Sequence, residues 1–396
     1  MADIAAFSAY RYDAQKVGGL ERVITQPYDK ISPAMLERYL AASPYNLARV
    51  IKTTDHQAAA RCLTDWRHDG VLVRDQQPAL YAYSQSYTLP ATGEQRTRRA
   101  LIASLKLEEY AAGVVYRHEL TLAGPKQDRL DLMRATRAHC ELLFLLHDDP
   151  GGEIAELLSE VTSERPTGEL RDDFGDQHSL WRIHRKTTVT EFRRMFAPLP
   201  LLMADGHHRY ETALAFHKEA PAADRVLVAL VSMDSPGLTI LPTHRLLVRV
   251  PGFSRERLLQ NLSGDFEIHE TPVEKGHAAL APRTLGAYFA DHQSFFMLRA
   301  KTDSCPLDVD LLHKRVLGDG LGISDEMVRQ EKCLEYVREF DKGLEGVRQG
   351  APACFFLHPV GVAQVREISF GGGVMPQKST DFYPKMLSGL VIQTVA

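Results

Sequence analysis

Helical and strand patterns alternate along the whole sequence, and this alternation constrains the fold more than any other feature. Helical periodicity over residues 126–139 and 189–196 is followed each time by an apolar strand pattern, over 141–146 and 199–203. A further apolar run covers 238–250, and no internal repeat interrupts the order. Alternating elements of this kind favour a mixed architecture. The sequence therefore predicts an α+β (mixed α/β) fold.

The length of the chain indicates more than one domain. The chain has 396 residues, enough for two or three domains at roughly 150 residues each. We expect an N-terminal α/β region over residues 1–250 and a C-terminal α/β lobe over residues 251–396. The tail around Tyr383-Pro384-Lys385 carries proline, aromatic and lysine residues, which is unusual for a frayed terminus. We expect this tail to fold back towards the functional site.

Composition excludes several classes of protein. Lys and Arg total 47 and Asp and Glu total 51, which gives a net charge of −4. The chain lacks the global basic character of most nucleic-acid binders, so no nucleic-acid partner is expected. No apolar run approaches the ~18 residues of a membrane span, and the N-terminus does not resemble a signal peptide. Five widely spaced cysteines favour reduced thiols in a cytoplasmic protein.

The segment most indicative of chemistry is a turn between a strand pattern and a helix pattern. An apolar strand runs into Asp205-Gly206, and an amphipathic helical pattern follows. Backbone N–H groups and the helix dipole at such a turn favour an anion, and Gly206 permits close approach of a ligand. Arg209 offers a planar fork for phosphate oxygens. His207 and His208 add donors, and one of them could relay a proton near neutral pH.

Two other interpretations of this turn remain open. Asp205 could simply cap a helix whose first histidines lie on the surface. Alternatively, Asp205, His207 and His208 could bind a metal ion. Adjacent histidines on a helix point about 100° apart, so both rarely reach one ion. Anion binding is therefore favoured over metal binding.

The stretch Asp205-Gly206-His207-His208-Arg209 resembles the phosphate-binding signature of the ParB/sulfiredoxin superfamily, including its ADP-dependent free-serine kinases. Further motifs resemble the bacterial and archaeal family known as domain of unknown function 1015: Pro27–Ile31, Asn46–Val50, Arg117–Thr121 with Lys126, Asp128 and Arg129, and Met375–Lys385. The resemblance implies a ParB/sulfiredoxin-like core within residues 1–250. It also implies an additional α/β lobe, closely integrated with that core around one cleft.

Carboxylates and cations elsewhere in the chain complete the candidate site. Asp29 follows a Pro-Tyr turn and Glu119 precedes a loop, and either could orient an acceptor hydroxyl or take its proton. Glu119 could also bind Mg²⁺. Each segment could equally be a solvated turn, helix start or tail. The cations that could neutralise phosphate or substrate carboxylate charge are Lys126, Arg129, Lys378 and Lys385.

Together these features predict a nucleotide-dependent phosphotransferase, a kinase, that acts on a small hydroxyl-bearing metabolite. Free serine is implied by the resemblance alone. The expected cofactors are ATP or ADP, with CTP as another candidate, and Mg²⁺; Glu119, Asp29 and His208 are the catalytic candidates. A second hypothesis is a nucleotide-binding switch or NTPase without small-molecule turnover. A third is a metal-dependent hydrolase using His118, His207 and His208, which their spacing does not directly support.

Overall fold

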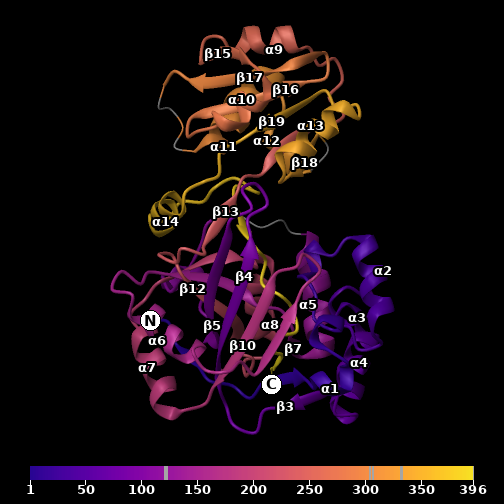
Figure 1. Ribbon diagram of the computed structural model, residues 1–396, viewed down its shortest axis with the longest axis vertical. Coiled ribbons are helices and arrows are strands. Elements are labelled where there is room, and N and C mark those ends of the chain that lie inside the picture. Colours follow the sequence, from indigo (N-terminus) through magenta and orange to yellow (C-terminus); the bar gives the residue numbers. More distant parts are fainter. Residues whose placement is uncertain (120–123, 303–304, 306, 331–332, 396) are drawn as a thin grey trace. The chain divides into compact units, whose positions relative to one another are not determined.

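The computed structural model describes residues 1–119, 124–302, 305, 307–330 and 333–395. Contacts group the chain into two compact units (Figure 1): Met1–Thr239 with Pro384–Ala396, and Ile240–Tyr383. The chain therefore leaves the first unit after Thr239 and returns to it at Pro384, whereas the sequence placed a single boundary at residue 250. Both units combine helices with sheets, which confirms the mixed α/β class.

A large mixed sheet forms the centre of the first unit. Its strand order is β6-β11-β8-β12-β5-β4-β10-β9, with β1 also paired to β5. A turn at residues 90–93 joins β4 to β5 as a hairpin, with Tyr83 opposite Ala100. The strands of this sheet are β1 (Ile4–Ala5), β4 (Leu80–Thr88), β5 (Gln95–Lys106), β6 (Val115–Arg117), β8 (Leu143–His147), β9 (Gly168–Arg171), β10 (Gln177–Ile183), β11 (Leu201–Asp205) and β12 (Arg225–Ser232).

Helices of the first unit bury their apolar stripes in the core of this sheet. Leu158 and Phe192 share one core with residues of β4 and β5. The helical segments are α1 (Ala14–Val17), η1 (Leu20–Arg22), η2 (Tyr28–Lys30), α2 (Pro33–Ala42), α3 (Ala48–Ile51), α4 (His56–His68), η3 (Tyr110–Ala112), α5 (Gly124–Thr136), α6 (Glu153–Thr162), α7 (Lys186–Phe196) and α8 (His207–Glu219). Helices α5 and α8, which carry Arg129 and Arg209, pack against each other.

The C-terminal segment is part of the first unit, where it ends near β7 (Figure 1). Buried Arg98 donates to the carbonyl oxygen of Pro384 at 2.5 Å, and Gln85 donates to that of Lys385 at 2.9 Å. Further along, β21 (Gln393–Thr394) pairs with β7 (Ala138–His139). A second small ladder joins β2 (Tyr10–Tyr12) to β3 (Leu72–Arg74). The tail backbone is thus held by buried side chains and by sheet pairing.

Two elements have different bounds in the structure from those that the sequence predicts. The expected helix over 126–139 stops at Thr136, because Arg137 adopts φ 45° and Ala138–His139 pairs with the distant C-terminal segment. The apolar run 238–250 is divided into β13 (Thr239–Leu241) and β14 (His244–Leu247). Pro242 lies between them, and proline has no N–H group for a sheet ladder.

The second unit is built around its own sheet, with helices on both faces. The strand order is β15-β17-β16-β19-β14-β18. Helix α9 and segment η4 contribute to the core on one face, and α13 to the core on the other. The elements are β15 (Phe266–Thr271), β16 (Thr284–Phe289), β17 (His292–Ala300), β18 (Leu334–Val337), β19 (Ala353–Phe356), β20 (Asp381–Tyr383), α9 (Arg255–Leu262), α10 (Val273–Ala278), α11 (Asp308–Leu311), the π-helical η4 (Leu312–Gly320), α12 (Asp325–Arg329), α13 (Phe340–Arg348) and α14 (Val362–Phe370).

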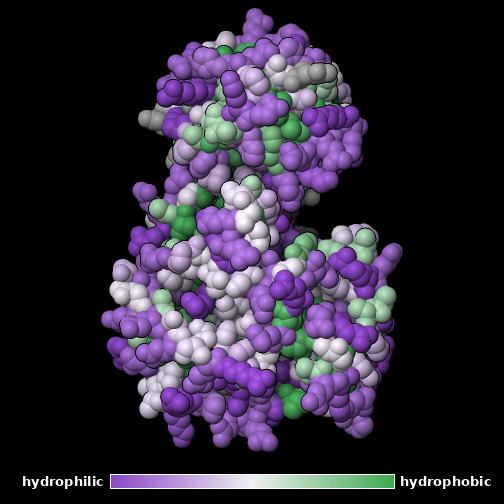
Figure 2. Space-filling model, viewed as in Figure 1, coloured by the Kyte–Doolittle hydropathy of each residue, from purple (hydrophilic) through white to green (hydrophobic). Residues whose placement is uncertain are grey.

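The surface visible in Figure 2 is mainly hydrophilic, and its apolar areas are small. Large apolar side chains that are well exposed, such as Phe174 and Val374, lie far apart in the sequence. Isolated apolar residues of this kind are normal on a protein surface. Within the described ranges, no helix combines the length and the apolar character needed to cross a bilayer.

Candidate functional site

The turn between β11 and α8 requires a glycine at position 206. Gly206 has φ 100°, a conformation that residues with a side chain rarely adopt. A Cβ atom at this position would lie only 2.6 Å from Cδ2 of Leu143, which is buried. Glycine has no side chain to cap the helix, so the first turn of α8 presents backbone N–H groups without a side-chain cap. The expected strand, turn and helix are confirmed, and a helix start of this kind favours anions.

Two cations hold the carboxylate of Asp205, the last residue of β11. Lys385 Nζ donates to Oδ1 at 3.0 Å, and Arg209 Nη2 donates to Oδ2 at 2.7 Å. The Lys385 side chain is 9% exposed. Its partner Asp205 lies 180 positions away in the sequence. Burial alone would raise the pKa of Asp205, but the charges of Lys385, Arg209 and Lys30 hold it well below its usual range. Asp205 is therefore a permanent anion at neutral pH.

The guanidinium of Arg209 connects the turn to the neighbouring strand. Its Nη1 donates to the carbonyl oxygen of Leu142 at 2.6 Å while Nη2 binds Asp205. Burial would lower the pKa of Arg209, but the carboxylates of Glu141, Asp205 and Asp29 raise it. Two of the five N–H groups of this side chain therefore hold the fold of the turn. The sequence predicted only that this planar fork suits phosphate oxygens.

Two histidines and a carboxylate lie beside the turn. The rings of His118 and His207 meet edge to face at 4.8 Å, and His118 Nε2 is 3.5 Å from Glu119 Oε1. Burial, together with the nearby His118, lowers the pKa of His207 to about 3. Its buried Nε2 atom has no hydrogen-bond partner among the described residues. His207 is therefore a neutral imidazole at pH 7, with one ring nitrogen available to a ligand.

A second group of residues approaches Arg209 from the N-terminal part of the chain. The Tyr28 N–H group donates to Glu141 Oε1 at 3.0 Å. Asp29 is exposed, and its charge contributes to the raised pKa of both Arg209 and Glu141. Burial raises the pKa of Tyr28 to about 12, so its hydroxyl stays protonated. The turn η2 thus places the exposed carboxylate of Asp29 near Glu141 and Arg209.

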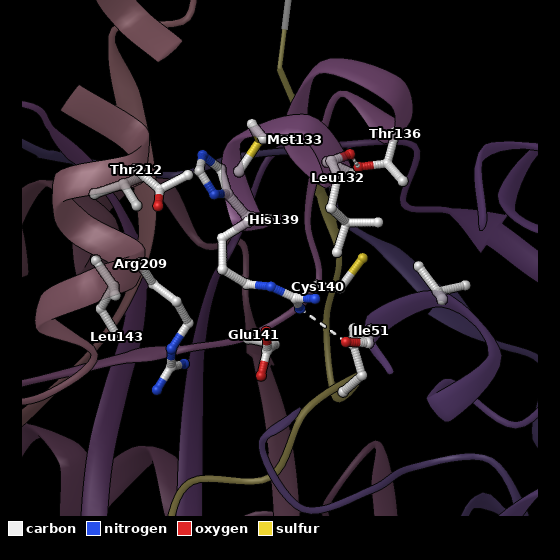
Figure 3. Close-up of a pocket in the computed structure, with 14 residues that line it drawn as sticks. Ile51, Leu132, Met133, Thr136, His139, Cys140, Glu141, Leu143, Arg209 and Thr212 are labelled. Atoms are coloured by element: carbon white, nitrogen blue, oxygen red, sulfur yellow. Dashed lines mark hydrogen bonds between the residues drawn. The ribbon is translucent and has the colours of Figure 1, made fainter. Parts of the chain in front are cut away.

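Arg129 and Arg209 line one pocket of the first unit (Figure 3). Arg129 Nη1 donates to the Ile51 carbonyl oxygen at 2.8 Å, and its guanidinium lies 4.3 Å from the centre of the Tyr28 ring. The pocket is small, with a cavity volume of about 50 Å³. Glu141 also lines it, so two guanidinium groups and a carboxylate share this pocket.

The structure therefore brings together most of the residues that the sequence singled out. Lys378, by contrast, belongs to the second unit, where Arg245 donates to its carbonyl oxygen at 3.1 Å. The Lys126 side chain lies outside the described residues. Partly buried His208 lies in the first turn of α8. In the part of the chain that the structure describes, no three His, Cys, Asp or Glu side chains form a metal cluster.

Sequence reasoning missed Glu141, which it interpreted as the first residue of a buried strand. A charged residue directly before the apolar run Leu142–Leu146 was the available signal. A buried carboxylate needs partners, and Glu141 finds them in Tyr28 and Ser388, both distant in sequence. Its importance follows only from the contacts of the folded chain.

The buried side chain of His139 should make the stability of the first unit depend on pH. Burial lowers its pKa to about 4 in the folded state. Between pH ~6.5 and ~4 the unfolded chain therefore binds more protons, and the free energy of unfolding falls as the pH is lowered. We expect His139→Asn to reduce the loss of Tm between pH 7 and 4.5. A pH profile parallel to that of the wild type would contradict this.

Several solved structures are similar to this chain. A free serine kinase in complex with ADP is 15% identical over 74% of this chain and 92% of its own, with a TM-score of 0.39. A conserved hypothetical protein from Pyrococcus furiosus is 14% identical over 74% of this chain and 95% of its own, with a TM-score of 0.38. C-terminally truncated SbnI from Staphylococcus aureus is 10% identical over 73% and 87%, with a TM-score of 0.41.

No curated protein matches the sequence. A family model does match, and it covers residues 4–318, which is most of the chain. The matched range includes the turn at Asp205–Arg209, the segment around Glu119 and the N-terminal Tyr28–Lys30 turn. The chain belongs to the family of proteins of unknown function termed DUF1015.

Proposed function

We propose that the first unit binds a nucleotide at the Asp205–Arg209 turn and transfers a phosphoryl group to a small hydroxyl-bearing metabolite. The observation that carries this proposal is the uncapped start of α8 at Gly206, next to the unpartnered Nε2 atom of His207. Phosphoryl transfer needs positioning and charge neutralisation more than covalent chemistry. Backbone N–H groups and a neutral imidazole supply donors to phosphate oxygens without a large desolvation cost.

The pair of His118 and Glu119 provides a proton acceptor for the metabolite hydroxyl. His118 Nδ1 lies 2.6 Å from the carbonyl oxygen of Met203. A carbonyl oxygen can only accept, so Nδ1 carries the hydrogen and Nε2 faces Glu119 at 3.5 Å. A proton taken from the hydroxyl by Glu119 can then be shared with Nε2. Asp29 is the second candidate for this role, and free serine is one candidate acceptor.

ATP or ADP is the proposed phosphoryl donor, with CTP as the other candidate. Asp205 is already bound by Lys385 and Arg209, so Glu119 is the better candidate ligand for Mg²⁺. Mg²⁺ usually takes one or two protein carboxylates together with phosphate oxygens and water. Bound in this way, the ion would neutralise phosphate charge beside the turn.

Glu119→Gln separates binding from catalysis. Because the amide keeps the shape of the side chain but cannot accept the proton, we expect transfer to fall by about 100-fold or more. The nucleotide Kd measured without Mg²⁺ should stay within about threefold of the wild-type value. The assay follows labelled phosphate from ATP or ADP into serine, homoserine or glycerate. Glu109→Gln is the matched control, because Glu109 pairs with Lys218 on the surface.

Each outcome of this assay discriminates between the candidate functions. Absence of binding by ATP, ADP and CTP in the presence of Mg²⁺ would overturn the proposal. Binding without a labelled metabolite would favour the nucleotide-binding switch, in which the site serves a conformational change. Equal transfer by Glu119→Gln and the wild type would remove Glu119 as the proton acceptor and leave Asp29.

A further inference from the structure

Two buried polar side chains, Gln85 and Arg98, pair between neighbouring strands of the large sheet. Gln85 on β4 lies directly opposite Arg98 on β5 (Figure 1). Both residues are only 1% exposed. Arg98 donates to Gln85 Oε1 twice, from Nε at 3.2 Å and from Nη2 at 2.5 Å. A buried guanidinium is costly in free energy, so the groups that it holds in place are a guide to its role.

Arg98 fixes the orientation of the Gln85 amide. A guanidinium has only donors, so the atom that it binds has to be the amide oxygen. The amide nitrogen therefore makes the other contact of this side chain, and it donates to the carbonyl oxygen of Lys385 at 2.9 Å. Arg98 Nη2 also donates to the carbonyl oxygen of Pro384 at 2.5 Å. One pair of buried side chains thus holds two successive carbonyl groups of the C-terminal segment.

The backbone held in this way carries a cation of the candidate site. Lys385 Nζ donates to Asp205 Oδ1 at 3.0 Å. A lysine ammonium sits on a flexible four-carbon stem, so its position depends on where the backbone is held. Asp205 ends β11, next to Gly206 and the first turn of α8. The contacts therefore run from β4 and β5 through Lys385 to the proposed phosphate turn.

Neutralisation of Asp205 matters because phosphate is also an anion. Burial would raise the pKa of Asp205, but the charge of Lys385 and then that of Arg209 lower it, so the carboxylate is ionised at neutral pH. A phosphate that approaches the turn at Gly206 is repelled by this carboxylate unless both cations stay beside it. Displacement of the Lys385 ammonium from Asp205 should therefore weaken anion binding at the turn.

We propose that Gln85, oriented by Arg98, is a positioning residue for nucleotide binding. Its hydrogen bond to the backbone of Lys385 keeps the Lys385 ammonium against Asp205, so that the phosphate turn can accept an anion. The inference rests on the proposed nucleotide binding and adds to it two residues of the sheet that act through Lys385.

The first test does not depend on a nucleotide. Gln85→Leu removes the donor to the Lys385 carbonyl oxygen and adds no charge. The pKa of Asp205 should then rise towards its usual range, because the ammonium is held less closely; carbon-13 NMR titration of the carboxyl groups of the full-length protein follows it. In protein that already carries Lys385→Met, Gln85→Leu should leave the pKa of Asp205 unchanged, because no ammonium is left to place.

The second test measures ADP binding by calorimetry in the presence of Mg²⁺. Gln85→Glu keeps the shape of the side chain, and the new carboxylate still accepts from Arg98, whose charge keeps it ionised. It has no hydrogen to donate to the Lys385 carbonyl oxygen, so we expect ADP to bind about 3- to 10-fold more weakly. Ser86→Ala is the matched control, because Ser86 pairs with Thr97 at 2.9 Å across the same two strands but is exposed. This control should bind ADP like the wild type.

The outcomes separate this inference from the function on which it rests. Absence of ADP binding by the wild type overturns the nucleotide site, whereas the titration of Asp205 still decides whether Gln85 positions Lys385. An unchanged pKa of Asp205 in Gln85→Leu, or the same rise with and without the Lys385 side chain, overturns the positioning role. Equal ADP affinity of Gln85→Glu and Ser86→Ala also overturns it.

Melting curves of each variant verify that the fold is intact. If Gln85→Leu does not fold, Gln85→Glu is titrated in its place, with and without Lys385→Met. The proposal then requires a larger rise in the pKa of Asp205 where Lys385 is present.

Discussion

Gly206→Ala is expected to abolish nucleotide binding, with a loss of affinity of about 100-fold or more. The added methyl group would lie 2.6 Å from Leu143 Cδ2, and the backbone at φ 100° is unfavourable for alanine. Both strains are relieved only if the turn moves, and the N–H groups of α8 would move with it. Calorimetry with ADP and Mg²⁺ measures the effect directly.

A matched glycine separates this clash from a general effect of the substitution. Gly93 in the β4–β5 turn also has a positive φ, 71°, but a Cβ atom there meets nothing within 4 Å. We expect Gly93→Ala to lower stability slightly and to leave ADP binding unchanged. If Gly206→Ala binds ADP as well as Gly93→Ala does, the turn is not the phosphate site.

Lys385→Met should lower the free energy of unfolding of the first unit by about 2–4 kcal/mol. The reason is that the substitution leaves Asp205, which is only 22% exposed, with Arg209 as its remaining close cation. The loss should shrink as the pH falls below about 4, because Asp205 of the variant, which lacks the charge of Lys385, can be protonated there, whereas the wild-type carboxylate stays ionised. Denaturant unfolding at pH 7 and pH 3.5, followed by circular dichroism, provides the measurement.

Two further variants test whether the ion pair itself causes this loss. Asp205→Asn combined with Lys385→Met should lose less stability than the sum of the single changes, because the double variant removes both charges of the Asp205–Lys385 pair. Lys218→Met is the control, since Lys218 pairs with Glu109 at 2.8 Å on the exposed surface and surface pairs contribute little. A similar loss for Lys218→Met and Lys385→Met would show that the buried pair has no special role.

Local sequence patterns were sufficient to predict several elements. The hairpin turn at residues 90–93 and the helix after Asp55 follow from their turn and capping residues. The strand-turn-helix at Asp205–Arg209 was predictable for the same reason, because a glycine between an apolar strand and an amphipathic helix restricts the backbone locally. Such signals come from neighbouring residues and need no knowledge of the rest of the fold.

Long-range contacts decided the features that the sequence could not predict. The helix that was expected to reach His139 ends at Thr136, because the following residues pair with Gln393–Thr394. Glu141 seemed an ordinary start of a strand until Tyr28 and Ser388 were placed beside it. In each case the partner lies more than 100 residues away in the sequence, so no local pattern records it.

The sequence by itself determined the mixed α/β class and the strand-turn-helix at Asp205–Arg209, because both depend on residue spacing and on one glycine. Only the tertiary structure decided that Lys385, from the C-terminal segment, neutralises Asp205, and that Glu141 and Thr212 meet at one pocket. The physical reason is burial. A buried carboxylate or hydroxyl is stabilised by whichever partner the fold brings within hydrogen-bond distance, and the fold sets that choice through packing of the whole unit.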